Sequence, residues 1–139
     1  MKAEQLHDLW ASPDNSRLTT KQFSFRLPVH IAAKIAALCE IYPQKNRTQI
    51  VADLLTTALD ELEKNLPECA GERAEKSIEE HIAMESGEYQ PLYYMGGVRA
   101  RFQNVANRHY RELETELGNE NPEKLFPSVI GTKADFDKP

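Results

Sequence analysis

The sequence predicts a mainly α protein that forms an intertwined homodimer, built from one short N-terminal strand, two helices and a helical C-terminal extension. Residues 21–27 alternate polar and apolar side chains, residues 29–66 carry two amphipathic helical patterns, and no second strand of similar quality follows. Because a lone strand leaves its backbone donors and acceptors unpaired, we expect it to pair with the same strand of a second copy.

The alternating segment (residues 21–27) places its apolar residues on one face of a strand and its polar residues on the other. The apolar set is Phe23, Phe25 and Leu27, the polar set is Gln22, Ser24 and Arg26, and Pro28 ends the strand. Two such strands form an antiparallel ribbon that fits the major groove of DNA, where Gln, Ser and Arg side chains read base edges.

Two helices are expected after the strand. Apolar residues recur at helical spacing between Pro28 and Pro43, which predicts a helix over residues 29–42. A second helix is expected from Asn46 to about Leu66, because Asn46 and Gln49 match a capping box. The expected dimer core consists of Phe23, Phe25, Leu27, Ile35, Leu38, Ile50 and Leu54.

This ordered combination resembles the ribbon-helix-helix superfamily of bacterial and phage DNA-binding proteins, which includes the Arc, methionine and nickel repressors. The run from Gln22 to Pro28 is close to the Arc-like strand pattern, and the run from Asn46 to Val51 resembles the start of that family's second helix. The resemblance covers residues 21–65 and implies that Gln22, Ser24 and Arg26 read bases. Ser24 is shorter than the amide often found at its position, so weaker or water-mediated contacts are expected there.

The charge is divided unevenly along the chain. The whole protein carries a net charge of −5, whereas residues 17–47 contain six basic residues and one acidic residue, a local charge of +5. A helix N-terminus also presents unpaired N–H groups and partial positive charge, which suit a phosphate. The expected phosphate-binding residues are Lys21, Lys45, Asn46, Arg47 and Thr48.

The flanking regions are less informative. Residues 1–20 are expected to be an N-terminal arm, either a flexible one with a short helix that packs Trp10 or one whose Arg17 and Lys21 follow the DNA backbone. There is no apolar run long enough to span a membrane and no signal-peptide core, so a cytoplasmic protein is expected. The resemblance to bacterial DNA-binding proteins implies a bacterial one. Cys39 and Cys69 form no disulfide framework and are expected to be reduced.

The C-terminal half matches no pattern that we can assign to a family. We expect a linker at residues 67–71, a helical extension over 72–118 and a tail over 119–139. Within the extension, charged residues 72–86 and residues 98–117 predict helices that end at Gly87 and Gly118. The extension is expected to enlarge the dimer, to bind a protein partner, or to form a small-molecule pocket with Tyr89, Tyr93 and Tyr94.

The sequence contains no recognisable catalytic or metal-binding motif. The four histidines are far apart, and Glu79, Glu80 and His81 lack the spacing of a metal-binding helix, so they are expected to form a solvated face. No glycine-rich phosphate loop or activated nucleophile is recognisable. We therefore expect no enzyme activity, no metal and no cofactor.

Two functions remain open at this point. The first is a homodimeric transcriptional regulator, expected to be a repressor, which binds a palindromic or repeated operator in double-stranded DNA, with neighbouring dimers associating as a dimer of dimers. The second is the antitoxin of a toxin–antitoxin pair, whose C-terminal region binds a toxin protein and whose DNA binding regulates its own operon. A toxin-like reading frame beside the gene would distinguish the two.

Overall fold

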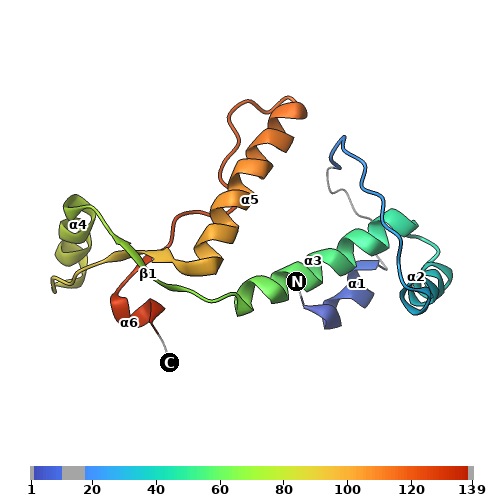
Figure 1. Cartoon of the computed structure of the whole chain (residues 1–139), viewed down its shortest axis with the longest axis horizontal. Helices are drawn as coiled ribbons and strands as arrows, with labels where there is room; N and C mark the ends of the chain where they lie inside the picture. Colours follow the sequence, from blue (N-terminus) through green and yellow to red (C-terminus); the bar gives the residue numbers. More distant parts are fainter. Residues whose placement is uncertain (1, 11–17, 138–139) are drawn as a thin grey trace. The chain divides into compact units, whose positions relative to one another are not determined.

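The protein divides into two compact units in a computed structural model, which describes residues 2–10 and 18–137 (Figure 1). The N-terminal unit comprises residues 1–65 and the C-terminal unit residues 66–139. Each unit has its own contacts and is described separately below.

The N-terminal unit is helical. A 3₁₀ turn, η1 (Ala3–Gln5), leads into the short helix α1 (Leu6–Trp10), and the two longer helices are α2 (Val29–Ile41) and α3 (Arg47–Asn65). Both long helices agree with the helical spacing in the sequence, so these two predictions are confirmed. The N–H groups of Ile31 and Ala32 donate to the carbonyl of Pro28, which therefore begins α2 from the N-cap position.

The core of the N-terminal unit lies where α1 packs against the two long helices. Leu6, Trp10 and Ile50 are buried together, and Ile50 is completely inaccessible to solvent. The half-buried side chains that surround them are Leu38, Cys39, Tyr42 and Leu54. The prediction that a short helix packs Trp10 against the protein is confirmed.

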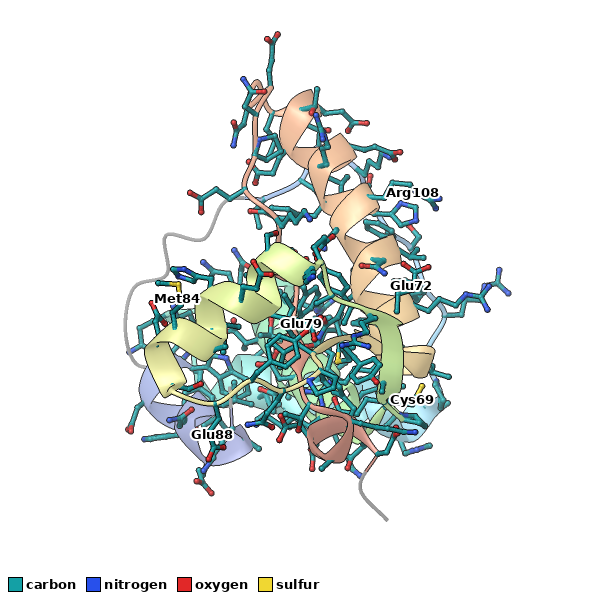
Figure 2. The ribbon with its side chains drawn as sticks, turned by 90° about the vertical axis from the view of Figure 1, so that its left-hand side faces the viewer. Cys69, Glu72, Glu79, Met84, Glu88 and Arg108 are labelled. Carbon is teal, nitrogen blue, oxygen red and sulfur yellow. The ribbon has the colours of Figure 1, made fainter. Side chains whose placement is uncertain are left out.

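The C-terminal unit is a mixed α/β structure. Its elements in order are β1 (Cys69–Arg73), α4 (Lys76–Ser86), β2 (Tyr93–Gly96), α5 (Gly97–Glu116), β3 (Ile130–Gly131) and α6 (Lys133–Phe136). The three strands form one antiparallel sheet in the order β1-β2-β3. Figure 2 shows Glu79 on the side of α4 that faces the rest of this unit and Met84 on the outer side, in agreement with their burial.

The predicted fold class is wrong. Instead of a mainly α chain with a single N-terminal strand, the described residues contain six α-helices and a three-stranded sheet, and all three strands lie in the C-terminal unit. Residues 21–28 form no strand within the single chain. The physical reason is that a strand needs a neighbouring strand for its backbone hydrogen bonds, and the residues that the structure describes provide none beside this segment.

The C-terminal strands occupy segments for which no strand was expected. β1 includes most of the expected linker, β2 lies between the two expected helices of the extension, and β3 lies in the expected tail. The two predicted helices of this region are present as α4 and α5, but α4 begins at Lys76, because residues 72–73 belong to β1. Both predicted ends are confirmed by glycines with positive φ, Gly87 at 82° and Gly118 at 96°.

Two glycines allow β1 and β2 to approach closely. The pairing of Cys69 with Gly96 and of Ala70 with Met95 is followed by a register shift before Arg73 pairs with Tyr93. A Cβ atom added at Gly71 would lie 2.9 Å from the carbonyl oxygen of Tyr94, and one added at Gly96 would lie 2.9 Å from the Cα of Gly71. The sheet therefore has no space for a side chain at either position.

Candidate nucleic-acid interface

The alternating segment has no regular secondary structure, and its two aromatic side chains lie side by side. The rings of Phe23 and Phe25 are stacked with centroids 6.5 Å apart and planes within 7° of each other. Residues two apart in an extended backbone lie on the same side, so this stacking agrees with the alternation in the sequence.

The apolar face of the segment is open to solvent. Phe23 is 66% exposed, Phe25 74% and Leu27 49%. An aromatic side chain buries about 150–250 Å² when it is packed, so leaving two of them in water forgoes a large hydrophobic stabilisation. Contiguous exposed apolar residues of this kind usually mark a surface that another molecule covers.

The opposite face carries the predicted base-reading residues. Gln22, Ser24 and Arg26 are all exposed, and none of them hydrogen-bonds to another residue that the structure describes. Arg can donate two hydrogen bonds to a guanine edge and Gln can bond both groups of an adenine edge, whereas Ser makes a single, less selective contact. The three side chains are therefore available for contacts outside the chain.

The start of α3 is built as the sequence predicts. The backbone N–H of Gln49 donates to Oδ1 of Asn46 at 2.8 Å, and the backbone N–H of Asn46 donates to Oε1 of Gln49 at 3.1 Å. This reciprocal capping box uses two donors at the helix end, and the N–H groups of Arg47 and Thr48 remain for an outside acceptor. Both of these residues are exposed.

The predicted phosphate-binding lysines lie in different environments. Lys21 is exposed, and its backbone N–H donates to Oγ1 of Thr19 at 3.2 Å. Lys45 is only 5% exposed, and its Nζ is buried without a hydrogen-bond partner among the described residues. Arg47 is thus the side chain whose charge is accessible at the start of α3, whereas the ammonium group of Lys45 is withdrawn from solvent.

The expected dimer-core residues are divided between two environments. Ile50, Leu38 and Leu54 belong to the core with α1, whereas the apolar residues of the alternating segment are exposed. Ile35 on α2 is half-buried. Within one chain, the structure therefore does not bring the seven residues together.

Polar contacts that the sequence did not reveal hold α1 in place. The indole N–H of Trp10 donates to Oδ2 of Asp53 at 2.7 Å, and both residues are buried. Nδ1 of His7 lies 2.6 Å from the hydroxyl of Tyr42, whose ring packs edge-on against Trp10. The signal in the sequence was the position of Asp53, which lies three residues after Ile50 and one before Leu54 on the apolar side of α3.

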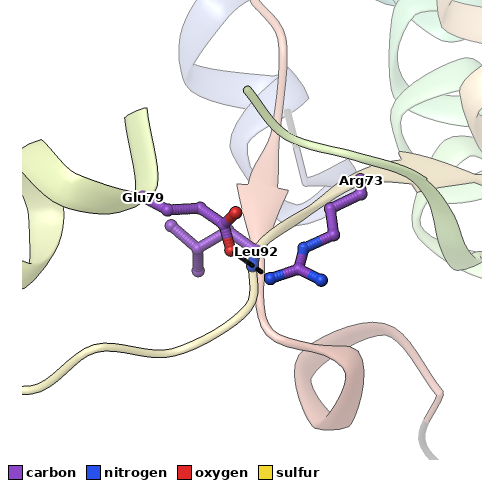
Figure 3. A network of polar contacts seen from close by, with 3 residues as sticks. All are labelled: Arg73, Glu79 and Leu92. Carbon is purple, nitrogen blue, oxygen red and sulfur yellow. Dashed lines mark hydrogen bonds and ion pairs between the residues drawn. The ribbon is translucent and has the colours of Figure 1, made fainter. Parts of the chain in front are cut away.

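A buried carboxylate in the C-terminal unit was also missed (Figure 3). Glu79 is 3% exposed, and its Oε2 accepts hydrogen bonds from the backbone N–H of Leu92 at 2.8 Å and from Arg73 at 3.3 Å. Burial raises the pKa of the Glu79 carboxyl, but these hydrogen bonds and the nearby guanidinium outweigh that effect and hold the pKa below its usual value. The prediction that Glu79 lies on a solvated face is wrong, and its role here is to fix the segment before β2 against α4.

A second carboxylate is paired with the sheet. The hydroxyl of Tyr94 donates to Oε2 of Glu75, which lowers the pKa of Glu75 and raises the pKa of Tyr94. Of the three tyrosines expected to line a pocket, Tyr94 lines a groove beside α5, whereas Tyr89 is 55% exposed.

The described residues show no cluster of three or more His, Cys, Asp or Glu side chains that could hold a metal ion. No helix in residues 2–10 and 18–137 combines the length and apolar composition needed to cross a bilayer. Comparison with protein-family models, with curated proteins and with solved structures finds no match to this chain.

Proposed function

We propose that this protein is a sequence-specific DNA-binding transcriptional regulator of the bacterial cytoplasm that acts as a homodimer and represses its target genes. The alternating segments of two copies pair as a two-stranded ribbon, which enters the major groove of a palindromic or repeated operator. The observation that carries the proposal is the alternating segment itself, with its apolar face and its polar face both exposed in the single chain.

Pairing of two copies would bury the apolar face of this segment and leave its polar face free to contact DNA. The apolar side chains of two copies would cover one another and the helices behind them, and the backbone groups would gain hydrogen-bond partners. Gln22, Ser24 and Arg26 would then project from the outer face toward base edges. Phosphate contacts would come from the open N–H groups at the start of α3 and from Arg47.

The charge distribution supports the same conclusion. Residues 17–47 carry a net charge of +5, and a homodimer doubles this charge beside the ribbon. Such a local basic surface attracts the DNA backbone even though the protein as a whole is acidic. The compact C-terminal unit favours a regulator over an antitoxin, because toxin neutralisation is expected to use an extended segment that wraps around its partner.

The test is selection of bound sequences from a random duplex DNA pool by the purified full-length protein at near-physiological salt. We expect enrichment of a short palindrome or tandem repeat. Arg26→Ala should lose the preference at one or more positions by about 1–3 kcal/mol while remaining a dimer. Lys34→Ala, which removes an exposed basic side chain from α2, is the matched control and should select the same sequence.

Two results would contradict the proposal. A folded dimer that enriches no sequence would show that the ribbon is not a reading element. An Arg26→Ala variant that selects the same operator with unchanged stringency would remove the assignment of the reading face.

A further inference from the structure

A groove in the C-terminal unit has the dimensions of a small-molecule site. It has a volume of about 590 Å³, and it is lined by α5, by residues of strands β1 and β2 and by the segment 124–129. Ligand sites in proteins commonly enclose about 300–1,000 Å³. All of its lining residues belong to the C-terminal unit, so the groove does not depend on the DNA-binding region.

The segment 124–129, which forms the wall of the groove opposite α5, is held in place by hydrogen bonds to its backbone. Nδ2 of Asn107 donates to the carbonyl of Phe126 at 2.9 Å, and the N–H of Phe126 donates to Oδ1 of Asn107 at 2.7 Å. The N–H of Met95 donates to the carbonyl of Val129 at 3.0 Å. Because hydrogen bonds fix this segment at Phe126 and at Val129, the wall is already ordered without a ligand. Binding therefore loses less conformational entropy.

Two cations from different segments meet at this groove. Arg101 comes from α5 and Lys124 from the segment that follows it, and both line the groove. Neither side chain has a hydrogen bond or an ion pair with any other residue in the described ranges. Two cations that line one concave surface attract an anion.

The remaining lining provides polar contacts and an apolar wall. Gln103 and Asn104 present side-chain amides that are not hydrogen-bonded to other described residues, unlike Asn107 on the same helix. The apolar wall consists of Met95, Phe126, Pro127 and Val129. Glu72 on β1, which Figure 2 shows beside α5, adds one carboxylate that can accept hydrogen bonds from polar substituents of an occupant. An occupant therefore needs an anionic group, a body that packs against apolar side chains, and polar substituents.

We propose that this groove binds a small organic anion, in which one carboxylate or phosphate group is joined to a ring-sized apolar body. Arg101 and Lys124 bind the anionic group, and the wall around Phe126 covers the body. A polyanion such as nucleic acid is disfavoured, because residues 67–139 carry nine basic and fourteen acidic residues, a net charge of −5. The charged residues that line the groove are Arg101, Lys124 and Glu72, a local net charge of +1, which suits a single anionic group.

Three probes test the proposal with isotope-labelled full-length protein and amide chemical shifts. Phenyl phosphate and benzoate each carry an anionic group on a ring, whereas phenol carries the ring without a full charge at neutral pH. We expect saturable shifts at the amides of Gln103, Asn104 and Ser128 with at least one of the anions, and the tighter-binding anion identifies the preferred anionic group. Phenol should bind much more weakly.

Matched variants separate the groove from general electrostatics. Arg101→Ala/Lys124→Ala should weaken binding of the preferred anion by about tenfold or more, since the charged donors for its hydrogen bonds are removed. Arg108→Ala/Lys133→Ala removes the same charge from positions outside the groove and should leave the affinity unchanged. Equal binding of phenol, unchanged affinity in the first double variant, or no saturable shift with either anion would overturn the proposal. None of these measurements involves DNA, so their failure is separate from failure of the proposed regulatory function.

Discussion

The indole N–H of Trp10 donates a hydrogen bond of 2.7 Å to Oδ2 of Asp53, which joins the short N-terminal helix to the middle of α3. Trp10 is 4% exposed and Asp53 is 8% exposed, so both partners of this bond are shielded from water. Leu6 and Trp10 are therefore part of the N-terminal core, and the attachment of α1 can be weakened without changing the DNA-reading residues.

Replacement of this acceptor should loosen α1. We expect Asp53→Ala to destabilise the N-terminal unit by about 1–3 kcal/mol, because the buried indole N–H loses its partner. The protein contains one tryptophan, so its fluorescence reports on this contact directly. The emission should shift to the red in Asp53→Ala and remain unchanged in the control Glu61→Ala, an exposed position on the same helix. Unchanged emission and stability in Asp53→Ala would show that the hydrogen bond does not hold α1.

The buried carboxylate of Glu79 should make the C-terminal unit sensitive to acid. Its pKa in the folded protein is lowered from 4.5, so its stabilising contribution is complete above that value and is lost as the pH falls through the lowered folded pKa. We expect hydrogen exchange at the Leu92 N–H, corrected for the intrinsic rate, to accelerate below pH 4.5 in the native protein. Glu79→Gln should remove this acid dependence, whereas Glu80→Gln, which changes an exposed neighbour, should retain it. The same acid profile in Glu79→Gln would assign the effect to another group.

The exposed aromatic face should be required for self-association. We expect Phe25→Ala to weaken the dimer by about 3–5 kcal/mol, as large-to-small changes at buried aromatic positions do. Because Phe25 is 74% exposed in the single chain, the helical circular dichroism of the dissociated protein should be retained. Analytical ultracentrifugation over a range of concentrations measures the change, and Met84→Ala, at a position 85% exposed in the C-terminal unit, is the control. A Phe25→Ala variant with an unaltered dimer dissociation constant would place the dimer interface elsewhere.

Binding to the DNA backbone should be separable from base reading. Arg47→Ala is expected to weaken binding to operator and to random duplex DNA by similar factors, because an interaction with a phosphate carries no sequence information. The slope of the logarithm of affinity against the logarithm of salt concentration should become shallower by about 0.9 for each phosphate that the variant no longer neutralises. Lys64→Ala, at an exposed position of α3 outside residues 17–47, provides the control for removal of an exposed charge. Reduced selectivity in Arg47→Ala would instead indicate that this side chain reads bases.

The two hydrogen bonds between the side chain of Asn107 and the backbone of Phe126 should hold the wall of the groove (residues 124–129) against α5. Asn107→Ala removes both hydrogen bonds, each worth about 0.5–1.5 kcal/mol, and we expect faster hydrogen exchange at the Phe126 N–H. Asn104→Ala removes an amide from the same helix without a comparable bond and should leave this exchange rate unchanged. If Asn107→Ala behaved like the control, the wall would be held mainly by its apolar contacts.

Helices were predictable here because their ends carry strong local signals. Proline or glycine follows the helical patterns that end near residues 42, 66, 86 and 117, and the capping box of Asn46 with Gln49 marks the start of α3. The strands lack such signals. β1 contains Ala70 and Gly71 without alternation, and β3 consists of only two residues, so their pairing depends on contacts between distant segments.

The same distinction applies to the functional residues. Alternation over residues 22–27 singled out a segment whose two faces are both exposed in the single chain, but the segment does not form the strand that the pattern predicts. Burial of Glu79 and Lys45 could not be inferred from composition, because charged residues usually lie at the surface. For Glu79 the signal was its position between Ile78 and Ile82, on the inner side of α4. For Lys45 the sequence offers no comparable signal.

The facing glycines of the sheet, Gly71 and Gly96, provide a means of finding relatives. Since neither position has space for a Cβ atom while β1 and β2 remain paired, any protein that preserves this sheet must keep glycine at both places. The two positions are 25 residues apart in the sequence, and α4 lies between them. A glycine pair at this separation, with a helix between its members and a long helix after the second, forms a sparse signature that can identify relatives whose remaining residues have diverged.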